Sequence, residues 1–434
     1  MNKRRVVLIC PEPIRGCVQG IGIRFIEMTK YIGVFHEAVL WTCNEDIPGD
    51  IGITAVPFPS AEQFGAEMAQ TDAVVIHGHI SERYFDMLRS RQVDSPPLVV
   101  DLYDPFLIEN LQYTAELGEY IFYRDRTVLF RQLSLGDFFL ASSEIQRMFY
   151  FGIMTGTGRI TPQVYHSDRS GDQLIAIAPF GVEPVSETTL QAIAGKLKGQ
   201  VPGIASDSMV IFFGGIYDWY DPETLVNILD GIIENFPKVK VVFSVNPNQE
   251  TTPQGVFKKI RDFAELKGWR DRHIFFIPWF PYSDRFAYLR DVDIAVCLHK
   301  PSIETSLSLR TRVLDYMNAG IPVIATEGGE GGRILTEASA ALLVPPYDEE
   351  LLRNAMTSLL KDIIMSQTLG SNGRRWIHSN MTWGKSLRPL LEYCNSPYRS
   401  SEGFNQDVVV TSFCKRMSFA RILSYVKRCL KTGR

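Results

Sequence analysis

Two arginines and an aspartate lie close together near the middle of the segment 304–326. Arg310 and Arg312 come at the start of a predicted helix, and Asp315 follows in its first turn. The N–H groups at a helix N-terminus bind anions, and guanidinium groups bind phosphate oxygens in pairs. A carboxylate nearby can accept hydrogen bonds from the two hydroxyls of a ribose. The segment therefore predicts a site for a ribose diphosphate, although an ordinary helix–strand unit with surface charge has the same pattern.

The apolar pattern around these residues predicts the elements that would position them. Val313, Leu314 and Met317 form the apolar stripe of a short helix, which Ala319-Gly320 ends. Pro322 then forces an extended chain, and the run 323–325 is typical of a parallel strand buried on both faces. The predicted charged residues would thus stand at the edge of a parallel sheet.

The run Leu314-Asp315-Tyr316-Met317-Asn318-Ala319-Gly320-Ile321-Pro322-Val323 resembles the donor-nucleotide motif of retaining glycosyltransferases of the group 1, or family 4, type. The resemblance implies the GT-B fold, an α/β architecture with two Rossmann-like parallel-sheet domains facing a central cleft. The paired acids of that family would fall on Leu307 and Asp315, so the first acid is missing here. Glu304 lies nearby and is the candidate to supply it.

The loop after the first predicted strand carries Gly20, Gly22 and Arg24. The two glycines allow close backbone approach, and a helix that starts near Ile21 would aim N–H groups at a ligand. The full dinucleotide fingerprint is absent because Phe25 holds the place of the third glycine, and a plain tight turn is the alternative. The loop resembles the entry loop of related transferases, which implies a position near the donor phosphates.

Two further loops of the first half carry ionisable side chains. His77 and His79 follow a predicted strand, but metal binding would need a third ligand, and structural histidines are the alternative. Asp101 and Asp104 end the next strand, where the family has an acid that contacts acceptor or sugar. Asp104 could equally be a turn former or a helix cap before Pro105.

In the second half, Gly214-Gly215 follows a predicted strand and permits approach to a phosphate. The family places an arginine and a lysine near this loop, and neither is present, so Arg310 and Arg312 are the expected substitutes. The resemblance then implies Asp104, Glu304 and Arg310 as catalytic residues. The implied donor-binding residues are Gly20, Gly22, Arg24, Gly214, Gly215, Tyr217, Trp279, Phe280, His299, Arg310, Arg312 and Asp315.

Tyr217 and Trp219 could stack on a base or a sugar, and core or interdomain packing is the alternative. Trp279-Phe280 is the expected base platform, and His299 would end a strand opposite the sugar. No metal and no other cofactor is expected, because no Asp-x-Asp motif is visible.

Composition narrows the class of protein. The chain has 434 residues, 45% of them hydrophobic, which is enough for two ordinary cores. A net charge of −4 gives no general attraction to nucleic acid. The seven cysteines are scattered, which favours a reducing cytoplasm. The apolar run near the start is too short for a signal peptide, and no run is long enough to span a bilayer.

Strand-like and helix-length runs alternate twice along the chain, which indicates two parallel-sheet domains. We expect an acceptor domain at 1–182, a nucleotide-sugar donor domain at 183–379, and a helix at about 380–397 that crosses back to the first domain. Residues 398–434 form a tail with basic and apolar residues at near-helical spacing and no acidic residue after Phe413. Such a tail is typical of membrane-surface binding, and a disordered solubilising tail is the alternative.

Taken together, the sequence predicts a cytoplasmic enzyme that moves a sugar from a nucleotide diphosphate to a glycan or lipid-linked acceptor. The basic tail predicts a peripheral position on the cytoplasmic face of the membrane. Retention is implied by the family. Two alternatives remain open. A sugar-nucleotide epimerase of the same fold would use paired carboxylates in the cleft. A catalytically silent partner subunit is the second alternative, because this chain lacks the first acid of the family and its Arg/Lys pair.

Overall fold

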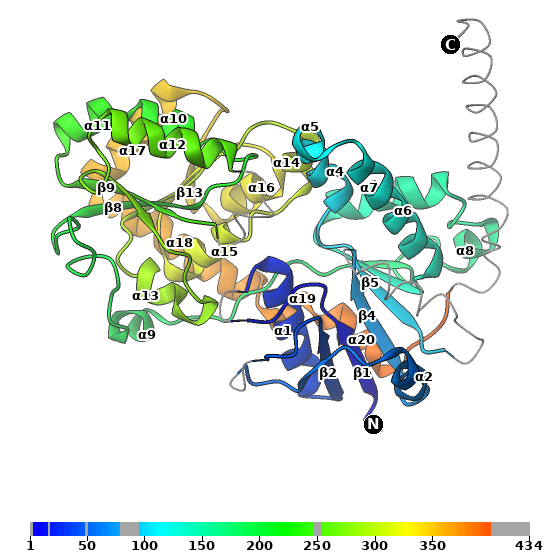
Figure 1. Ribbon diagram of the computed structural model, residues 1–434. Coiled ribbons are helices and arrows are strands. Elements are labelled where there is room, and N and C mark those ends of the chain that lie inside the picture. The colour runs from blue at the N-terminus through cyan, green and yellow to red at the C-terminus, as the bar shows by residue number, and fades with distance from the viewer. Residues whose placement is uncertain (1–2, 16–17, 48–50, 79–94, 247–253, 401–434) are drawn as a thin grey trace, which may run out of the picture.

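Two fully parallel β-sheets form the framework of the chain (Figure 1). The computed structural model describes residues 3–15, 18–47, 51–78, 95–246 and 254–400. The first sheet has the order β3-β2-β1-β4-β5-β6-β7. Its strands are β1 (Arg5–Ile9), β2 (Glu37–Thr42), β3 (Ala55–Pro57), β4 (Ala73–His77), β5 (Leu98–Asp101), β6 (Phe138–Ala141) and β7 (Ile175–Ile177).

The second sheet has the order β10-β9-β8-β11-β12-β13. Its strands are β8 (Met209–Gly215), β9 (Val239–Ser244), β10 (Ile274–Ile277), β11 (Ile294–Cys297), β12 (Val323–Thr326) and β13 (Ala341–Val344). The strand order reverses at β1 in the first sheet and at β8 in the second sheet. Open α/β sheets bind ligands at such a switch point. The prediction of two parallel-sheet domains with the GT-B architecture is confirmed.

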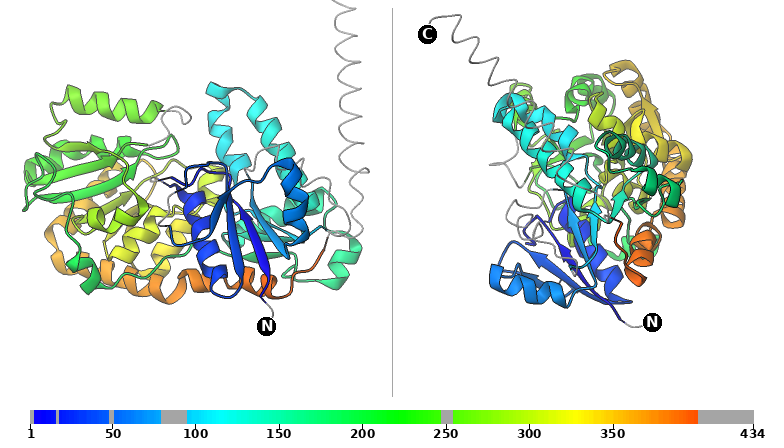
Figure 2. Two further views of the ribbon diagram at one scale, coloured as in Figure 1. Left: turned by 60° about the horizontal axis from the view of Figure 1, so that its bottom comes forward. Right: turned by 90° about the vertical axis from the view of Figure 1, so that its right-hand side faces the viewer.

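Helices cover both faces of each sheet (Figures 1 and 2). The first domain contains α1 (Gly20–Gly33), α2 (Ala61–Ala69), α4 (Phe106–Glu109), the 3-10 helix η1 (Asn110–Tyr113), α5 (Thr114–Leu117), α6 (Tyr120–Leu135), α7 (Glu144–Gly156) and α8 (Pro162–Ser167). The second domain contains α9 (Glu187–Ala192), α10 (Pro222–Asn227), α11 (Leu229–Asn235), α12 (Gly255–Leu266), η2 (Tyr282–Asp284), α13 (Arg285–Leu289), α14 (Ile303–Leu307), α15 (Arg312–Ala319), α16 (Gly329–Ala338), α17 (Glu349–Lys361) and α18 (Ile363–Asn380). No described helix is both long and apolar enough to cross a membrane.

The chain passes between the domains twice, and the two passages lie side by side. Val182 of the first passage donates its N–H to Met381 O at 2.8 Å and pairs with Thr382 of the second. After α18, the helices α19 (Trp383–Ser386) and α20 (Arg388–Asn395) pack on the first domain (Figure 2). There the ring of Tyr393 stacks on Phe138 with centroids 4.6 Å apart. One apolar core therefore runs from the first sheet through both passages to the second sheet.

Two strands differ from the sequence-based expectation. The strands β3 and β7 were not predicted, since each has three residues at a sheet edge and only partial burial. The sequence of 183–208 predicts a hinge with no buried strand, and the structure describes no strand there. The segment does contain the short helix α9, at whose start Ser186 accepts a hydrogen bond from Thr189 N. The basic tail lies almost entirely outside the described residues, which end at Ser400.

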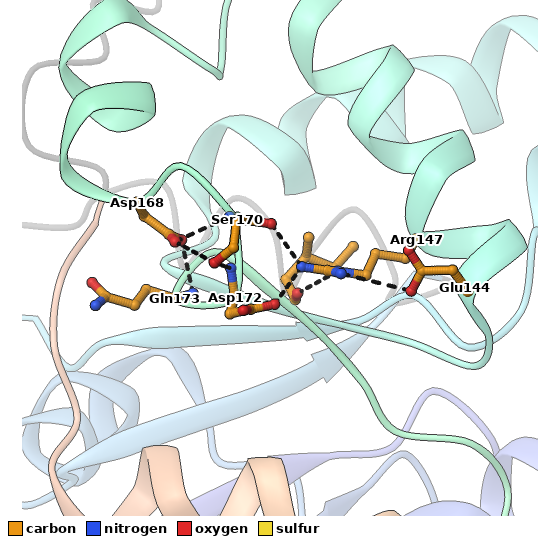
Figure 3. A network of polar contacts seen from close by, with 8 residues as sticks. Glu144, Arg147, Asp168, Ser170, Asp172 and Gln173 are labelled. Carbon is orange, nitrogen blue, oxygen red and sulfur yellow. Dashed lines mark hydrogen bonds and ion pairs between the residues drawn. The ribbon is translucent and has the colours of Figure 1, made fainter.

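A polar network holds the turn before edge strand β7 and the start of the strand (Figure 3). The Asp168 carboxylate accepts backbone N–H bonds from Gly171 at 3.0 Å and Gln173 at 2.8 Å, which closes the turn before the strand. Arg147 of α7 donates to Ile175 O at 3.0 Å and to Asp172 Oδ1 at 2.6 Å. These contacts add to the burial of Leu174 and Ile175 in the core of the first domain.

Two glycines in helices give a matched pair of stability predictions. A Cβ on Gly370 of α18 would lie 2.0 Å from the carbonyl oxygen of Gly320, whereas one on Gly152 of α7 would meet nothing within 4 Å. Gly370→Ala is expected to lower the free energy of unfolding by about 1–3 kcal/mol, because backbone must shift. Gly152→Ala is expected to raise it by about 0.5–1 kcal/mol through helix propensity. Urea unfolding of both variants checks the signs, and equal effects would contradict the close packing of α18 on this turn.

Candidate active site

A cleft of about 340 Å³ lies between the two domains, at the carboxyl ends of their strands. Residues from both domains line it, and they include most of those singled out in the sequence. These are Gly20, Asp104, Gly214, Gly215, Tyr217, Trp279, Phe280, Arg310, Arg312 and Asp315. The two sheets thus bring together side chains that are almost 300 residues apart in sequence. The cleft has the position expected for a ligand site in this fold class.

Arg310 and Glu304 form a buried ion pair on the second-domain side of the cleft. The Nη1 group of Arg310 donates to Glu304 Oε1 at 2.9 Å, and Nη2 donates to Oε2. Only Arg310 of the two lines the cleft, while Glu304, on α14, lies behind it. Arg310 Nε is buried and has no hydrogen-bond partner within the part of the chain that the structure describes. That N–H therefore remains for an acceptor that a ligand would bring.

Arg312 fixes the loop after β8. Its Nη1 donates to the carbonyl oxygens of Phe213 at 2.8 Å and Gly215 at 2.9 Å, and its guanidinium lies over the Tyr220 ring at 4.0 Å. Gly214 between these carbonyls has φ of +82°, and a Cβ there would also crowd Arg312. Nε and Nη2 of Arg312 make no hydrogen bond to any described residue, so they can bind an anion in the cleft.

The far end of the cleft is aromatic. Trp279, Phe280 and Tyr282 line it after β10, and Phe280 stacks on Tyr288 with centroids 4.2 Å apart. A Cβ on Gly215 would lie 2.8 Å from Trp279, so glycine is required for this approach. A flat apolar surface of this kind suits a nucleotide base, as the sequence predicts for Trp279 and Phe280.

Asp315 lines the same end and is held by a residue that the sequence reasoning did not identify. Arg285 of α13 donates from Nε to Asp315 Oδ1 at 3.0 Å and from Nη1 to Tyr282 O at 2.9 Å. Burial raises the pKa of Asp315, and the charge of Arg285 acts in the opposite direction. Asp315 Oδ2 has no protein hydrogen bond among the described residues, so the carboxylate can still accept one from a ligand hydroxyl.

The first-domain side of the cleft is acidic. Glu12, Asp104 and Glu109 line it, and only Asp104 was predicted. Burial raises the pKa of Glu12, whose Oε2 accepts the N–H of Gly22 at 2.9 Å. Gly22 itself therefore supports the loop without lining the cleft. Gln19 donates to the Tyr217 hydroxyl at 3.2 Å, which joins the two domains at this end.

Three predicted donor-binding or neighbouring residues lie beneath the cleft instead of lining it. Arg24, fully buried, donates to both oxygens of Asp101 at 2.7 and 2.9 Å. His299 is buried behind Arg310, and burial together with the Arg310 charge lowers its pKa to about 4, so the imidazole is neutral at pH 7. His77 is buried against the Phe25 ring, and His79 lies outside the described residues. Any effect of Arg24 or His299 on a donor would pass through the groups that they contact.

Residues 207–362 match the family model described as glycosyl transferases group 1. Solved structures with the same fold include HepE from Anabaena in complex with UDP and glucose, 15% identical, covering 91% of this chain and 100% of its own, with a TM-score of 0.66. The chain has the GT-B fold. Sucrose-phosphate synthase from Thermosynechococcus elongatus is 16% identical over 91% of this chain and 99% of its own, with a TM-score of 0.63.

WaaG, a glycosyltransferase involved in lipopolysaccharide biosynthesis, is 13% identical over 90% of this chain and 100% of its own, with a TM-score of 0.60. A search of curated proteins gives no significant match. The group 1 match falls within the second domain and includes Arg310, Arg312 and Asp315. The chain therefore carries the guanidinium groups and the aromatic surface of the cleft on the domain that the family model matches.

Proposed function

We propose that this glycosyltransferase transfers a sugar from a nucleoside diphosphate to a hydroxyl of a glycan or lipid-linked acceptor, with retention at the anomeric carbon and without a metal ion. The observation that carries the proposal is the pair Arg310 and Arg312 in one cleft with Asp315. The cleft thus holds cations for a diphosphate, a carboxylate for a ribose and an aromatic surface for a base. HepE, of the same fold, binds UDP and UDP-glucose, which makes uridine nucleotides the first ligands to test.

The reaction breaks the bond between the anomeric carbon and the diphosphate, so negative charge develops on the leaving phosphate. That charge would be bound by Nε and Nη2 of Arg312 and by Nε of Arg310. Hydrogen-bond donors that are already in place where charge develops are a major source of rate acceleration. The acceptor is held in the same cleft, which removes the entropic cost of the encounter. Retention rests on the family resemblance, in which the leaving diphosphate takes the acceptor proton.

A panel of UDP, GDP, ADP and their glucose conjugates tests the proposal. One nucleotide diphosphate is expected to raise the thermal unfolding midpoint strongly, because it binds the folded state alone. Release of that nucleotide from its sugar conjugate, with an extract of membrane glycans as acceptor, should persist in EDTA. Stabilisation by none of the nucleotides would refute the proposal. Tight binding without turnover would favour the silent-subunit alternative.

The paired acids Asp104 and Glu109 give the epimerase alternative a specific observation in its favour. An epimerase would exchange a carbon-bound hydrogen of the donor sugar with solvent, whereas a transferase would not. Incubation of the protein with the bound sugar nucleotide in D₂O, followed by NMR of the sugar, separates the two. Deuterium incorporation would replace the transferase proposal.

Asp315 supplies a prediction about the ribose. Asp315→Asn is expected to weaken binding of every nucleotide that has a ribose by about 1–3 kcal/mol, because an acceptor oxygen is lost and a buried hydroxyl is left without its partner. Calorimetry with ribonucleotide and 2′,3′-dideoxyribonucleotide diphosphates measures it. The variant should bind both equally, and a retained preference for the ribonucleotide would show that another group binds the diol.

We further propose a cytoplasmic enzyme that attaches to the membrane surface through its tail. The support is the sequence alone: seven basic residues between Lys415 and Arg434 with no acidic neighbour. Each is worth about 1 kcal/mol near an anionic leaflet, and salt screens the attraction. The full chain is expected to sediment with phosphatidylserine vesicles at low salt and to be released at high salt. A chain that ends at Ser400 should remain in solution, and equal sedimentation of both would contradict the proposal.

A further inference from the structure

A buried asparagine on α15 clamps the first passage between the domains to the second domain. Asn318 is fully buried, and its Nδ2 donates to the carbonyl oxygen of Glu183 at 2.8 Å. Its Oδ1 accepts the N–H of Val185 at 3.1 Å. The side-chain amide thus satisfies two backbone groups of the passage, as a neighbouring strand would, and its burial strengthens both bonds.

The same amide reaches the second passage. Nε2 of His378, near the end of α18, lies 2.7 Å from Asn318 Oδ1. An amide oxygen can only accept, so His378 is the donor. His378 comes three residues before Met381, whose carbonyl oxygen accepts the Val182 N–H of the first passage. One side chain therefore ties both passages to the second domain.

The first domain holds the two passages by contacts of its own, both from α1. Arg24 donates to the carbonyl oxygens of Ala178 at 2.8 Å and Pro179 at 3.0 Å on the first passage. The hydroxyl of Tyr31 donates to the carbonyl oxygen of Gly384 at 3.1 Å on the second passage. Each passage is therefore fixed at one end to the first domain and at the other end to the second domain.

Short segments remain between these fixed ends, residues 180–182 of the first passage and 379–383 of the second. The two segments pair with each other, since Val182 donates to Met381 O at 2.8 Å and accepts from Trp383 N at 3.3 Å. A hinge has this construction, because a few residues between two rigid bodies absorb the change of backbone angles.

Helix α15 carries the hinge contact and two residues of the cleft. Arg312 begins the helix and Asp315 follows in its first turn, and both line the cleft. Asn318 comes three positions after Asp315, one turn further along the helix. The hinge is therefore fixed relative to these two cleft residues, and the first domain can close on them in one register.

We propose that Asn318 is a hinge clamp, a residue that limits how far the two domains separate and sets the register in which they close. Without its side chain, the unclamped segment of the first passage grows from 180–182 to 180–185. A longer segment allows more arrangements of the two domains, so the open forms gain conformational entropy. The inference goes beyond the proposed function, because it concerns the movement of the domains with or without a ligand. Asn318 is a positioning residue for that movement.

Scattering and amide exchange of the full chain test the clamp without any ligand. Asn318→Ala is expected to raise the radius of gyration above that of the wild type in small-angle X-ray scattering. The amide of Val185, which loses its acceptor, should exchange roughly tenfold faster. Asn372→Ala is the control, because Asn372 of α18 donates to Ser339 O at 3.1 Å within the second domain. It should keep the wild-type radius and exchange. A wild-type radius in folded Asn318→Ala would overturn the proposal.

Two variants of His378 separate a change in the hinge from damage to the core. His378 is half-buried, so its substitution disturbs the packing less than that of Asn318 does. His378→Ala frees the second passage from Asn318 and should also raise the radius of gyration. His378→Gln keeps an N–H donor on the side chain and should restore the wild-type radius. Equal radii for the wild type and both variants would overturn the proposal, even where Asn318→Ala fails to fold.

Nucleotide binding and turnover separate this inference from the proposed function. The arginines, Asp315 and the aromatic surface all lie on the second domain, so Asn318→Ala should bind the nucleotide diphosphate within about twofold of the wild type. Turnover should fall roughly tenfold, because the closed form that brings both walls together is less populated. If no nucleotide binds the wild type, the proposed function fails, and the scattering still decides on the clamp. A loss of affinity equal to the loss of turnover would overturn the clamp, because Asn318 would then act on the nucleotide site through α15.

Discussion

Arg312→Ala is expected to lower the affinity for the nucleotide diphosphate roughly 10- to 150-fold, since a charge-assisted hydrogen bond is worth about 1.5–3 kcal/mol. Arg312 holds two carbonyls of the Gly214-Gly215 loop through Nη1 and keeps Nε and Nη2 for a ligand. The loss should appear with the diphosphate and be absent with the nucleoside alone, because the nucleoside carries no charge. Calorimetry with both ligands measures the difference.

The control variants isolate the phosphate contact. Arg270→Ala removes a guanidinium of the same domain that forms an exposed pair with Glu265, so it should leave both affinities unchanged. Arg310→Ala also removes a cleft donor, but it leaves Glu304 buried without its ion-pair partner. Combining it with Glu304→Gln removes that charge. If Arg312→Ala weakens nucleoside and diphosphate alike, the arginine acts on the shape of the loop and not on the phosphate.

The fold could be predicted from the sequence because buried parallel strands are apolar without interruption. The predicted run 323–325 lies within β12, and β6 is likewise apolar along its whole length. The missed strand β3 is the counterexample, because it contains Pro57 and lies half-exposed at the sheet edge. Its pairing with β2 depends on backbone hydrogen bonds, to which no side-chain period corresponds.

The site was predictable only in part, for a physical reason. Arg310, Arg312 and Asp315 are close in sequence, so one helix start brings them to one edge. Glu109 and Arg285 acquire their roles from partners on other elements, and neither stands in a recognisable motif. The turn Asp104-Pro105 does signal a short helix, and an acid one turn later is the available clue to the carboxyl pair.

Arg24 shows how a motif can identify a residue and not its role. Because α1 begins at Gly20, Arg24 lies in the second turn, where it faces the sheet and not the cleft. Its guanidinium binds both oxygens of Asp101 and the carbonyls of Ala178 at 2.8 Å and Pro179 at 3.0 Å. It thereby joins α1, the end of β5 and the first passage between the domains. Its expected effect is on stability.

Arg24→Ala is expected to lower the free energy of unfolding by about 3–5 kcal/mol, because Asp101 would remain buried without its partner. Burial already raises the pKa of Asp101, and Arg24 opposes that effect, so removing Arg24 would drive the acid towards its neutral form. Urea unfolding measures the loss, with Arg388→Ala as the control, since Arg388 forms an exposed pair with Glu392 and should cost at most about 0.5 kcal/mol.

Arg24→Met with Asp101→Leu removes both charges of this buried pair. It should recover part of the stability lost in Arg24→Ala, because no buried charge is left unpaired. Recovery should be incomplete, since the carbonyls of Ala178 and Pro179 lose their donor. The shortfall would measure what Arg24 contributes to the passage between the domains. If Arg24→Ala costs no more than Arg388→Ala, Asp101 must be satisfied without the arginine, and the passage is held by its apolar contacts alone.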